Sequence, residues 1–237
     1  MSLAAENLFD ETWFYAPVEQ LGELPLPVEE AHHAMRALRL RLGTDIIVSN
    51  GLGSVFRAKL VSDTGRIDIL ECILNEPEAP GLSLAIGLLK GRDVEEPIEA
   101  VCEFAVGDVF LLQTDHSSEF NGQNFDRLME RLRQKSLTAL KQAKKSWLTR
   151  IHPPEDLRTW RERHRNIPLA LAHPGQDTIP TPSPSIMHVL IGPEGGFSNS
   201  ELEYLQAQEN CYQLSLGPTR LRAIHAPVAA LGNLIGR

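Results

Sequence analysis

Residues 187–205 read Met-His-Val-Leu-Ile-Gly-Pro-Glu-Gly-Gly-Phe-Ser-Asn-Ser-Glu-Leu-Glu-Tyr-Leu. The first five are apolar or nearly so, which is typical of a buried strand, and the next five include three glycines, which free the backbone from side-chain constraints. Ser198 and Glu201 have the spacing of a capping box, which predicts that a helix begins after Ser198. The stretch therefore predicts a strand, a glycine-rich loop and a helix.

A loop of this kind at the carboxyl end of a strand exposes backbone N–H and C=O groups to a ligand, because few side chains stand in the way. This favours a nucleotide-like cofactor. The alternative is a tight turn between strand and helix that binds no ligand.

A second stretch, residues 211–222, reads Cys-Tyr-Gln-Leu-Ser-Leu-Gly-Pro-Thr-Arg-Leu-Arg. A short apolar strand again runs into a glycine, and an apolar helix is expected from about 223 to 234. Two such loops so close in sequence are expected on one face of the domain. Together the phrases IGPEGGFSNSE and LSLGPTRLR resemble the RsmE family, SPOUT-class enzymes that methylate N3 of a uridine in bacterial 16S ribosomal RNA.

Length and composition are those of an ordinary globular protein. The chain has 237 residues, of which 42% are hydrophobic and 23% charged, enough for two modest domains. It has neither an apolar run long enough to cross a bilayer nor a signal peptide, so we expect it in the cytoplasm. Its three cysteines, Cys72, Cys102 and Cys211, are isolated and indicate neither disulfides nor a zinc site, and no metal is expected.

Residues 1–75 are predicted to form a small β-rich domain. Strand-like runs cover 12–16, 45–49, 54–61 and 67–74. Between the first two runs, a helix over 28–40 is predicted from Val28, Ala31, Met35 and Leu38 at helical spacing, which leaves Arg36 and Arg39 outside the buried stripe. The resemblance implies that this domain is PUA-like and binds RNA, and we assign Arg36 and Arg39 to that role.

A linker with two prolines and a glycine, residues 76–81, separates this domain from a second one over 82–237. There strand-like and helix-like segments alternate, which predicts an α/β fold with a mostly parallel sheet. The resemblance implies that this is a SPOUT domain with a deep trefoil knot.

The chain has a net charge of −8, yet residues 127–150 carry eight basic residues and one acidic residue, a net of +7. A helix is predicted over 125–147, with an apolar side and a basic side. Such a concentration of positive charge suits RNA, although a solvated basic helix is the alternative. From the charge pattern and the family resemblance we assign RNA binding also to Lys90, Lys141, Gln142, Lys144 and Lys145.

The resemblance further implies S-adenosylmethionine as the methyl donor, held by three loops near 172–174, 192–196 and 214–221. Adenine would lie against apolar backbone, and glycines would allow its close approach. The residues assigned to the cofactor are Leu171, Ala172, His173, Ile191, Gly192, Pro193, Glu194, Gly195, Gly196, Leu214, Leu216, Gly217 and Leu221.

Uridine N3 is a weakly acidic imide nitrogen, so methylation requires that its proton be removed or that the developing negative charge be stabilised. Arg220, Arg222 and His225 are the candidates for these catalytic roles. The arginines could instead form ion pairs at a helix start, and His225 could be an ordinary surface histidine. The family usually has Thr-Glu-Thr where this chain has Ala223-Ile224-His225, and isoleucine can accept neither a proton nor a hydrogen bond.

The sequence therefore predicts a homodimeric, S-adenosylmethionine-dependent enzyme that methylates a uridine of 16S ribosomal RNA in the small subunit. Two alternatives stay open: a relative that binds RNA or the ribosome without transferring methyl, and a SPOUT methyltransferase with a different RNA target. A nucleotide-binding regulator is disfavoured because the sequence contains no phosphate-binding Gly-x-x-x-x-Gly-Lys-Ser/Thr loop.

Overall fold

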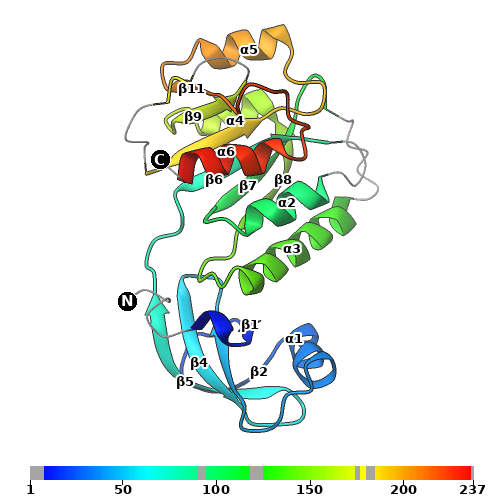
Figure 1. Cartoon of the computed structure of the whole chain (residues 1–237), viewed down its shortest axis with the longest axis vertical. Helices are drawn as coiled ribbons and strands as arrows, with labels where there is room; N and C mark the ends of the chain where they lie inside the picture. Colours follow the sequence, from blue (N-terminus) through cyan, green and yellow to red (C-terminus); the bar gives the residue numbers. More distant parts are fainter. Residues whose placement is uncertain (1–7, 90–93, 118–124, 174–176, 180–184, 236–237) are drawn as a thin grey trace. The chain divides into compact units, whose positions relative to one another are not determined.

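The computed structural model describes residues 8–89, 94–117, 125–173, 177–179 and 185–235. The chain divides into two compact units, shown in Figure 1. The first groups Met1–Ala79 with Leu137–Leu148, and the second groups Pro80–Ser136 with Thr149–Arg237. The sequence had assigned Leu137–Leu148 to the C-terminal domain, whereas its contacts place it in the first unit.

The first unit contains a five-stranded sheet in the order β1-β3-β4-β5-β2. The pairs β3–β4, β4–β5 and β5–β2 are antiparallel, whereas β1 and β3 are parallel. A tight turn joins β3 to β4, in which the Asn50 side chain accepts hydrogen bonds from the N–H groups of Leu52 and Ser54. The strands are β1 (Trp13–Tyr15), β2 (Gly22–Pro25), β3 (Asp45–Ser49), β4 (Ser54–Leu60) and β5 (Arg66–Asn75).

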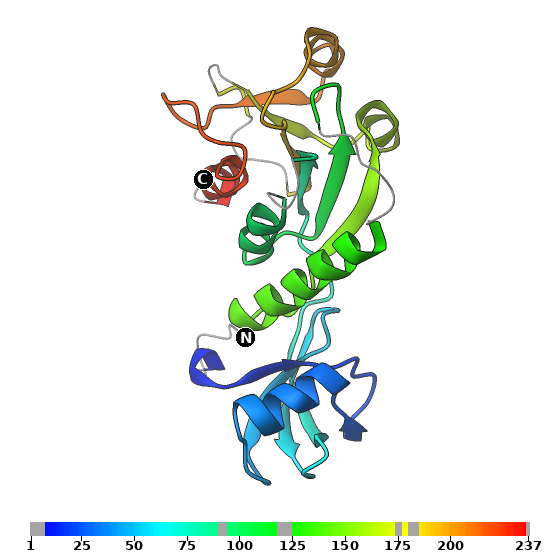
Figure 2. The same cartoon turned by 90° about the vertical axis from the view of Figure 1, so that its right-hand side faces the viewer.

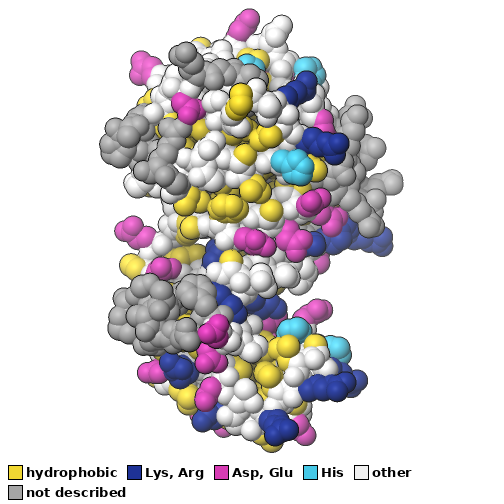
Figure 3. All heavy atoms as spheres, viewed as in Figure 1, with side chains coloured by type: hydrophobic (Ala, Val, Ile, Leu, Met, Phe, Trp, Pro, Cys, Tyr) yellow, Lys and Arg dark blue, Asp and Glu magenta, His cyan; other side chains and the backbone are white. Residues whose placement is uncertain are grey.

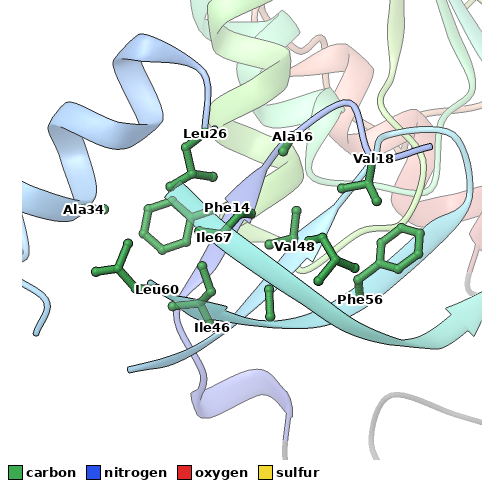
Figure 4. Close-up of a cluster of buried hydrophobic side chains, with 12 residues drawn as sticks. Phe14, Ala16, Val18, Leu26, Ala34, Ile46, Val48, Phe56, Leu60 and Ile67 are labelled. Carbon is green, nitrogen blue, oxygen red and sulfur yellow. The ribbon is translucent and has the colours of Figure 1, made fainter. Parts of the chain in front are cut away.

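Side chains from alternate strand positions fill the core of this unit (Figure 4). In β3, Ile46 and Val48 point into one cluster, while Ile47 between them belongs to a second cluster on the other face. Phe14 of β1 and Ala34 of the helical segment pack into the first cluster. This alternation is the period of two from which the strands were predicted.

The helical segment of the first unit differs from the prediction. It consists of α1 (Val28–His32) and a π-helical turn, η3 (His33–Ala37), and ends before residue 40. Val28 and Leu38, predicted to be buried, are 86% and 41% exposed. A π-helical turn contains more residues than an α-helical turn and therefore shifts the positions that follow it, including Leu38. Val28 precedes that turn and is the first residue of α1.

The end of helix α3 (Phe125–Gln142) and the loop after it belong to the first unit through specific polar contacts. Lys141 pairs with the buried carboxylate of Glu30, which also accepts a hydrogen bond from the N–H of Tyr15. Lys144 donates to the carbonyl of Glu11 and lies 5.7 Å from the centre of the Trp13 ring. Burial lowers the pKa of Lys144. Lys141 and Lys144, both predicted to bind RNA, therefore have intramolecular partners.

Replacing Lys141 by Ala should destabilise the protein by about 3 kcal/mol, because the buried Glu30 carboxylate would lose its counter-charge. Chemical denaturation followed by circular dichroism would measure this change. Arg133→Ala is the matched control, since Arg133 is an exposed cation on the same helix, and it should change the free energy of unfolding by less than about 0.5 kcal/mol. Equal effects of the two substitutions would contradict the assignment.

The second unit contains a six-stranded sheet in the order β11-β9-β10-β6-β7-β8, and every adjacent pair is parallel. This confirms the predicted α/β fold with a parallel sheet. The trefoil knot stays a prediction. The strands are β6 (Leu82–Gly87), β7 (Asp108–Gln113), β8 (Arg150–Asp156), β9 (Leu169–Ala172), β10 (Met187–Ile191) and β11 (Cys211–Leu214).

Helices cover both faces of this sheet, as parallel strands require. Helices α2 and α6 pack against each other on one face, and α4 lies on the other face against β7 and β8 (Figure 2). Within the described part of the chain, no helix is long and apolar enough to span a membrane. The remaining helices are α2 (Glu95–Cys102), α4 (Leu157–Arg163), α5 (Asn199–Gln206) and α6 (Ala226–Ile235).

An aromatic cluster between α4 and the sheet encloses a buried histidine. The rings of Phe110, Trp160, His164 and His188 have centroids 5.0 to 5.6 Å apart. His188 is 6% exposed, and neither of its ring nitrogens has a hydrogen-bond partner among the described residues. Burial lowers the pKa of His188 to about 4, and the nearby His164 and Arg161 act in the same direction. His188 is therefore neutral in the folded protein at pH 7.

This histidine should make stability depend on pH. Because an unfolded histidine has a pKa of about 6.5, the unfolded chain binds a proton between pH 6.5 and 4 that folded His188 does not bind. The free energy of unfolding should therefore decrease as the pH is lowered from 6.5 to 4, by about 3 kcal/mol in total. His188→Phe should remove this part of the pH dependence in denaturation measured from pH 7 to pH 4. The exposed His32→Phe should leave it as in the wild type, and parallel curves for the wild type and His188→Phe would contradict the prediction.

Candidate active site

Three loops at the carboxyl ends of β9, β10 and β11 meet around one cavity. These strands are neighbours in the sheet and run in the same direction, so the loops that follow them emerge at the same edge. The cavity has a volume of about 510 Å³. Its lining residues are Ala172, His173, Ile191, Gly192, Pro193, Glu194, Gly195, Gly196, Phe197, Leu216, Gly217, Pro218, Thr219, Arg220, Leu221, Ala223 and Ala226.

The loop after β10 is held between a neighbouring strand and the next helix. Gly87, the last residue of β6, lies so close to this loop that a Cβ added to it would stand 2.8 Å from the nitrogen of Pro193. Gly196 has a φ of +72°, a conformation that favours glycine. The predicted capping box is confirmed, since the Ser198 hydroxyl accepts from the N–H of Glu201 and the Glu201 carboxylate accepts from the N–H of Ser198.

The loop after β11 closes the cavity from the other side. The Asp177 carboxylate accepts a hydrogen bond from the N–H of Ser215 and fixes the start of this loop. Gly217 has a φ of +108°, and a Cβ added there would meet no other described atom within 4 Å, so the backbone turns sharply beside open space. The Arg220 guanidinium donates to the carbonyl of Glu194 at 3.4 Å, which links this loop to the glycine-rich loop.

Most residues assigned to the cofactor from the sequence lie around this cavity. Two of them do not line it: Leu171 and Leu214 are fully buried within β9 and β11. The sequence assignment omitted five lining residues. Phe197 lies within the quoted loop, so its position beside the glycines could have indicated it, whereas the others depend on how the chain turns after β11. The omitted residues are Phe197, Pro218, Thr219, Ala223 and Ala226.

The three catalytic candidates have different positions. All three are exposed, but only Arg220 lines the cavity; Arg222 and His225 are not among its lining residues in the described part of the chain. The carbonyl of Arg222 accepts hydrogen bonds from the N–H groups of His225 and Ala226, so these residues form the turn that leads into α6. Arg220 is therefore the candidate cation within the cavity.

The residues assigned to RNA also differ in their surroundings. Arg36 and Arg39 are exposed, and Gln142 is exposed at the end of α3. Lys145 is half-buried, like Lys141 and Lys144. Lys90 lies outside the described residues. The exposed cations of the first unit are therefore better placed for a polyanion than the lysines of 141–145.

No three His, Cys, Asp or Glu side chains come close enough to hold a metal ion within the residues that the structure describes. The cavity is lined mainly by apolar side chains and by backbone, with His173, Glu194 and Arg220 as the ionisable exceptions. Such a site suits an organic ligand that is recognised by shape and by a few polar groups.

Sequence profiles of known families cover both units. The profile described as RNA methyltransferase domain matches residues 77–235, and the profile described as RNA methyltransferase PUA domain matches residues 26–72. The chain belongs to the RNA methyltransferase family. This confirms the resemblance to the RsmE family and the PUA-like nature of the N-terminal domain.

Individual RNA methyltransferase relatives agree with this. A protein of Synechocystis named ribosomal RNA small subunit methyltransferase E is 29% identical over 233 residues, which cover 91% of this chain and 74% of the relative. A protein of the same name from Rickettsia conorii is 24% identical over 213 residues, covering 86% of this chain and 85% of that protein.

Solved structures share the fold of the whole chain. The structure of ribosomal RNA small subunit methyltransferase E from Neisseria gonorrhoeae, bound to S-adenosyl methionine, is 19% identical, with a TM-score of 0.79 over 95% of this chain and 97% of that one. A structure from Legionella pneumophila in complex with the cofactor SAM is 24% identical, with a TM-score of 0.82 over 95% and 97% of the two chains.

The backbone angle at Gly217 gives a direct test of the loop after β11. Gly217→Ala should destabilise the protein by about 1 kcal/mol or more, because a φ of +108° is strained for alanine even though its methyl group has space. Gly232→Ala is the matched control: Gly232 also has open space but lies within α6, where alanine should stabilise by about 0.5 to 1 kcal/mol. Thermal unfolding of both variants would show opposite shifts, and shifts of the same sign would count against this loop conformation.

Proposed function

We propose that this protein transfers the methyl group of S-adenosylmethionine to N3 of a uridine in the 16S ribosomal RNA of the small subunit. The observation that carries the proposal is the cavity at the edge of the RNA methyltransferase domain, where the loops after β9, β10 and β11 converge. The names of the relatives support the ribosomal target, and the bound ligands of two structures with this fold support the cofactor.

The residues of the cavity fit such a cofactor. Its volume of about 510 Å³ lies within the range of roughly 300 to 1,000 Å³ for small-molecule sites. Ile191, Leu216 and Leu221 provide apolar surface for an adenine ring. Gly196 and Gly217 leave open space where other residues would carry side chains. S-adenosylmethionine would supply the electrophilic methyl group, and these residues would hold it in place and exclude water.

Arg220 is the residue that we assign to the charge of the reaction. When uracil N3 loses its proton, negative charge spreads onto the neighbouring carbonyl oxygens, and a positioned cation lowers the energy of that state. Arg220 lines the cavity, and its exposed guanidinium donates to the carbonyl of Glu194 at 3.4 Å. A glutamate at position 224 is not needed for this role, so Ile224 is compatible with methyl transfer. Arg222 and His225 stay as further candidates that lie outside the cavity.

The proposal is tested by incubating the purified protein with tritium-labelled S-adenosylmethionine and small subunits that lack the modification. We expect labelled N3-methyluridine in the 16S RNA. Arg220→Ala should lower kcat about 100- to 1,000-fold, the usual effect of removing one charge-stabilising donor. The exposed Arg165→Ala on the same unit should act like the wild type. Cofactor binding by the wild type without any methyl transfer would support the lapsed, RNA-binding alternative.

We assign RNA binding to the exposed segment after α1. The consecutive residues 36–39 and 41–43 are all exposed and include Arg36, Arg39 and Arg41. Two apolar side chains lie among them, Leu38 at 41% and Leu42 at 60% exposure. Figure 3 shows dark blue and cyan side chains gathered around α1 on this face. Cations beside exposed apolar groups suit RNA, because phosphates and bases can both be contacted.

Replacing Arg36 and Arg39 together by Ala should weaken RNA binding and make the plot of log K against log salt shallower by about 1 to 2 units, because each phosphate contact contributes just under one unit. Filter binding of a 16S RNA fragment at several salt concentrations measures this slope. Arg66→Ala is the control, since Arg66 is paired with Glu23 on the sheet. A slope that is unchanged in the double variant would place the RNA elsewhere.

The homodimer implied by the family resemblance and a cytoplasmic location stay as proposals.

A further inference from the structure

A buried carboxylate joins the glycine-rich loop to a distant turn. Glu201 in α5 is 3% exposed. One of its oxygens accepts from the N–H of Ser198 at 2.8 Å, as the capping box requires. The other accepts from the N–H of Asp115 at 2.9 Å, in the turn that follows β7. The capping box needs the first of these bonds but does not explain the second.

A second hydrogen bond between the same two segments has its donor at the start of α5 and its acceptor in the turn. The Ser198 hydroxyl donates to the Asp115 carboxylate, so Asp115 and the start of α5 are joined by both a backbone and a side-chain hydrogen bond. We call these two bonds, together with the Glu201–Ser198 bond, the Asp115–Glu201 clasp. It joins two segments that are more than 80 positions apart in the sequence.

The turn that carries Asp115 has its own fixed shape. The Ser117 hydroxyl accepts from the N–H of Thr114 at 2.9 Å and donates to the carbonyl of the same residue at 3.0 Å, and the Gln113 amide donates to that hydroxyl. These bonds define the conformation of the turn whose Asp115 N–H donates to Glu201.

The same turn touches the wall of the cavity. His116 packs against Gly195, where an added Cβ would stand 2.9 Å from the Cβ of His116. Gly195 lines the cavity, and so do its neighbours on both sides. The turn therefore supports the glycine-rich loop behind its cavity-lining surface, while Arg220 holds the loop from the β11 side.

We propose that Glu201 is a positioning residue, which fixes the glycine-rich loop in its cofactor-binding shape by bonding to the turn at Asp115. Glu201 does not line the cavity and acts only through the loop. A carboxylate is required because both of its oxygens accept from backbone N–H groups, whereas an amide has only one accepting oxygen. This inference rests on the proposed function, since the ligand of the loop is S-adenosylmethionine.

The test compares Glu201→Gln with Glu203→Gln, the same substitution at an exposed position of the same helix. Calorimetric titration with S-adenosylmethionine, well below the melting temperature of each variant, should give a Kd about tenfold higher for Glu201→Gln and unchanged for Glu203→Gln. Hydrogen exchange at the amides of Gly195, Gly196 and Phe197 should be faster only in Glu201→Gln. A lower melting temperature with wild-type Kd and exchange would overturn the proposal, because it would show a purely structural role.

A second pair of variants tests the contact with the turn if Glu201→Gln does not fold. Gly195→Ala should raise the Kd, since its methyl group would collide with the Cβ of His116. Adding His116→Gly removes that Cβ and should restore the Kd to within about threefold of the wild type. A Kd that stays raised in the double variant would show that the methyl group obstructs the cavity itself, which would overturn support by the turn. If the wild type itself binds no S-adenosylmethionine, the proposed function is wrong. If the wild type binds it and only the variant results differ from those expected, the positioning role of Glu201 alone is wrong.

Discussion

The parallel pairing of β11, β9 and β10 determines where the candidate site lies. Because the three strands are neighbours and run in the same direction, the loops after them must emerge at one edge of the sheet. Two of these loops contain a glycine at positive φ, and all three line the same cavity. The site is thus a consequence of strand order, and loop composition then decides what the site can hold.

A cavity made of loops needs support from outside the loops, since loop backbone has few regular hydrogen bonds of its own. Here the support comes from three directions. Gly87 of β6 allows close packing of Pro193, Arg220 reaches across from the loop after β11, and Asp115 bonds to the helix that follows the glycine-rich loop. Glu201 is buried without being at the surface of the cavity, which is the position expected of a group that preserves loop shape.

The charges of helix α3 show how tertiary contacts change the meaning of a sequence pattern. A run of basic residues indicates a polyanion partner when it is seen alone. In the folded chain, Arg131 and Lys135 pair with Glu95 and Glu99, and Lys141 pairs with Glu30. Their partners precede them by more than 30 positions in the sequence, so the pattern of one helix did not show that they were neutralised.

The strand, glycine-rich loop and capped helix of 187–205 could be predicted from the sequence, because periodicity and capping depend on neighbours a few positions apart. The family resemblance supplied the chemistry and the residues assigned to the cofactor, most of which line one cavity. Tertiary structure alone decided that Arg220 lines the cavity while Arg222 and His225 do not, that a π-helical turn exposes Leu38, and that Glu201 reaches Asp115. These outcomes depend on contacts between distant segments, and such contacts form only when the packing of the whole unit brings those segments together.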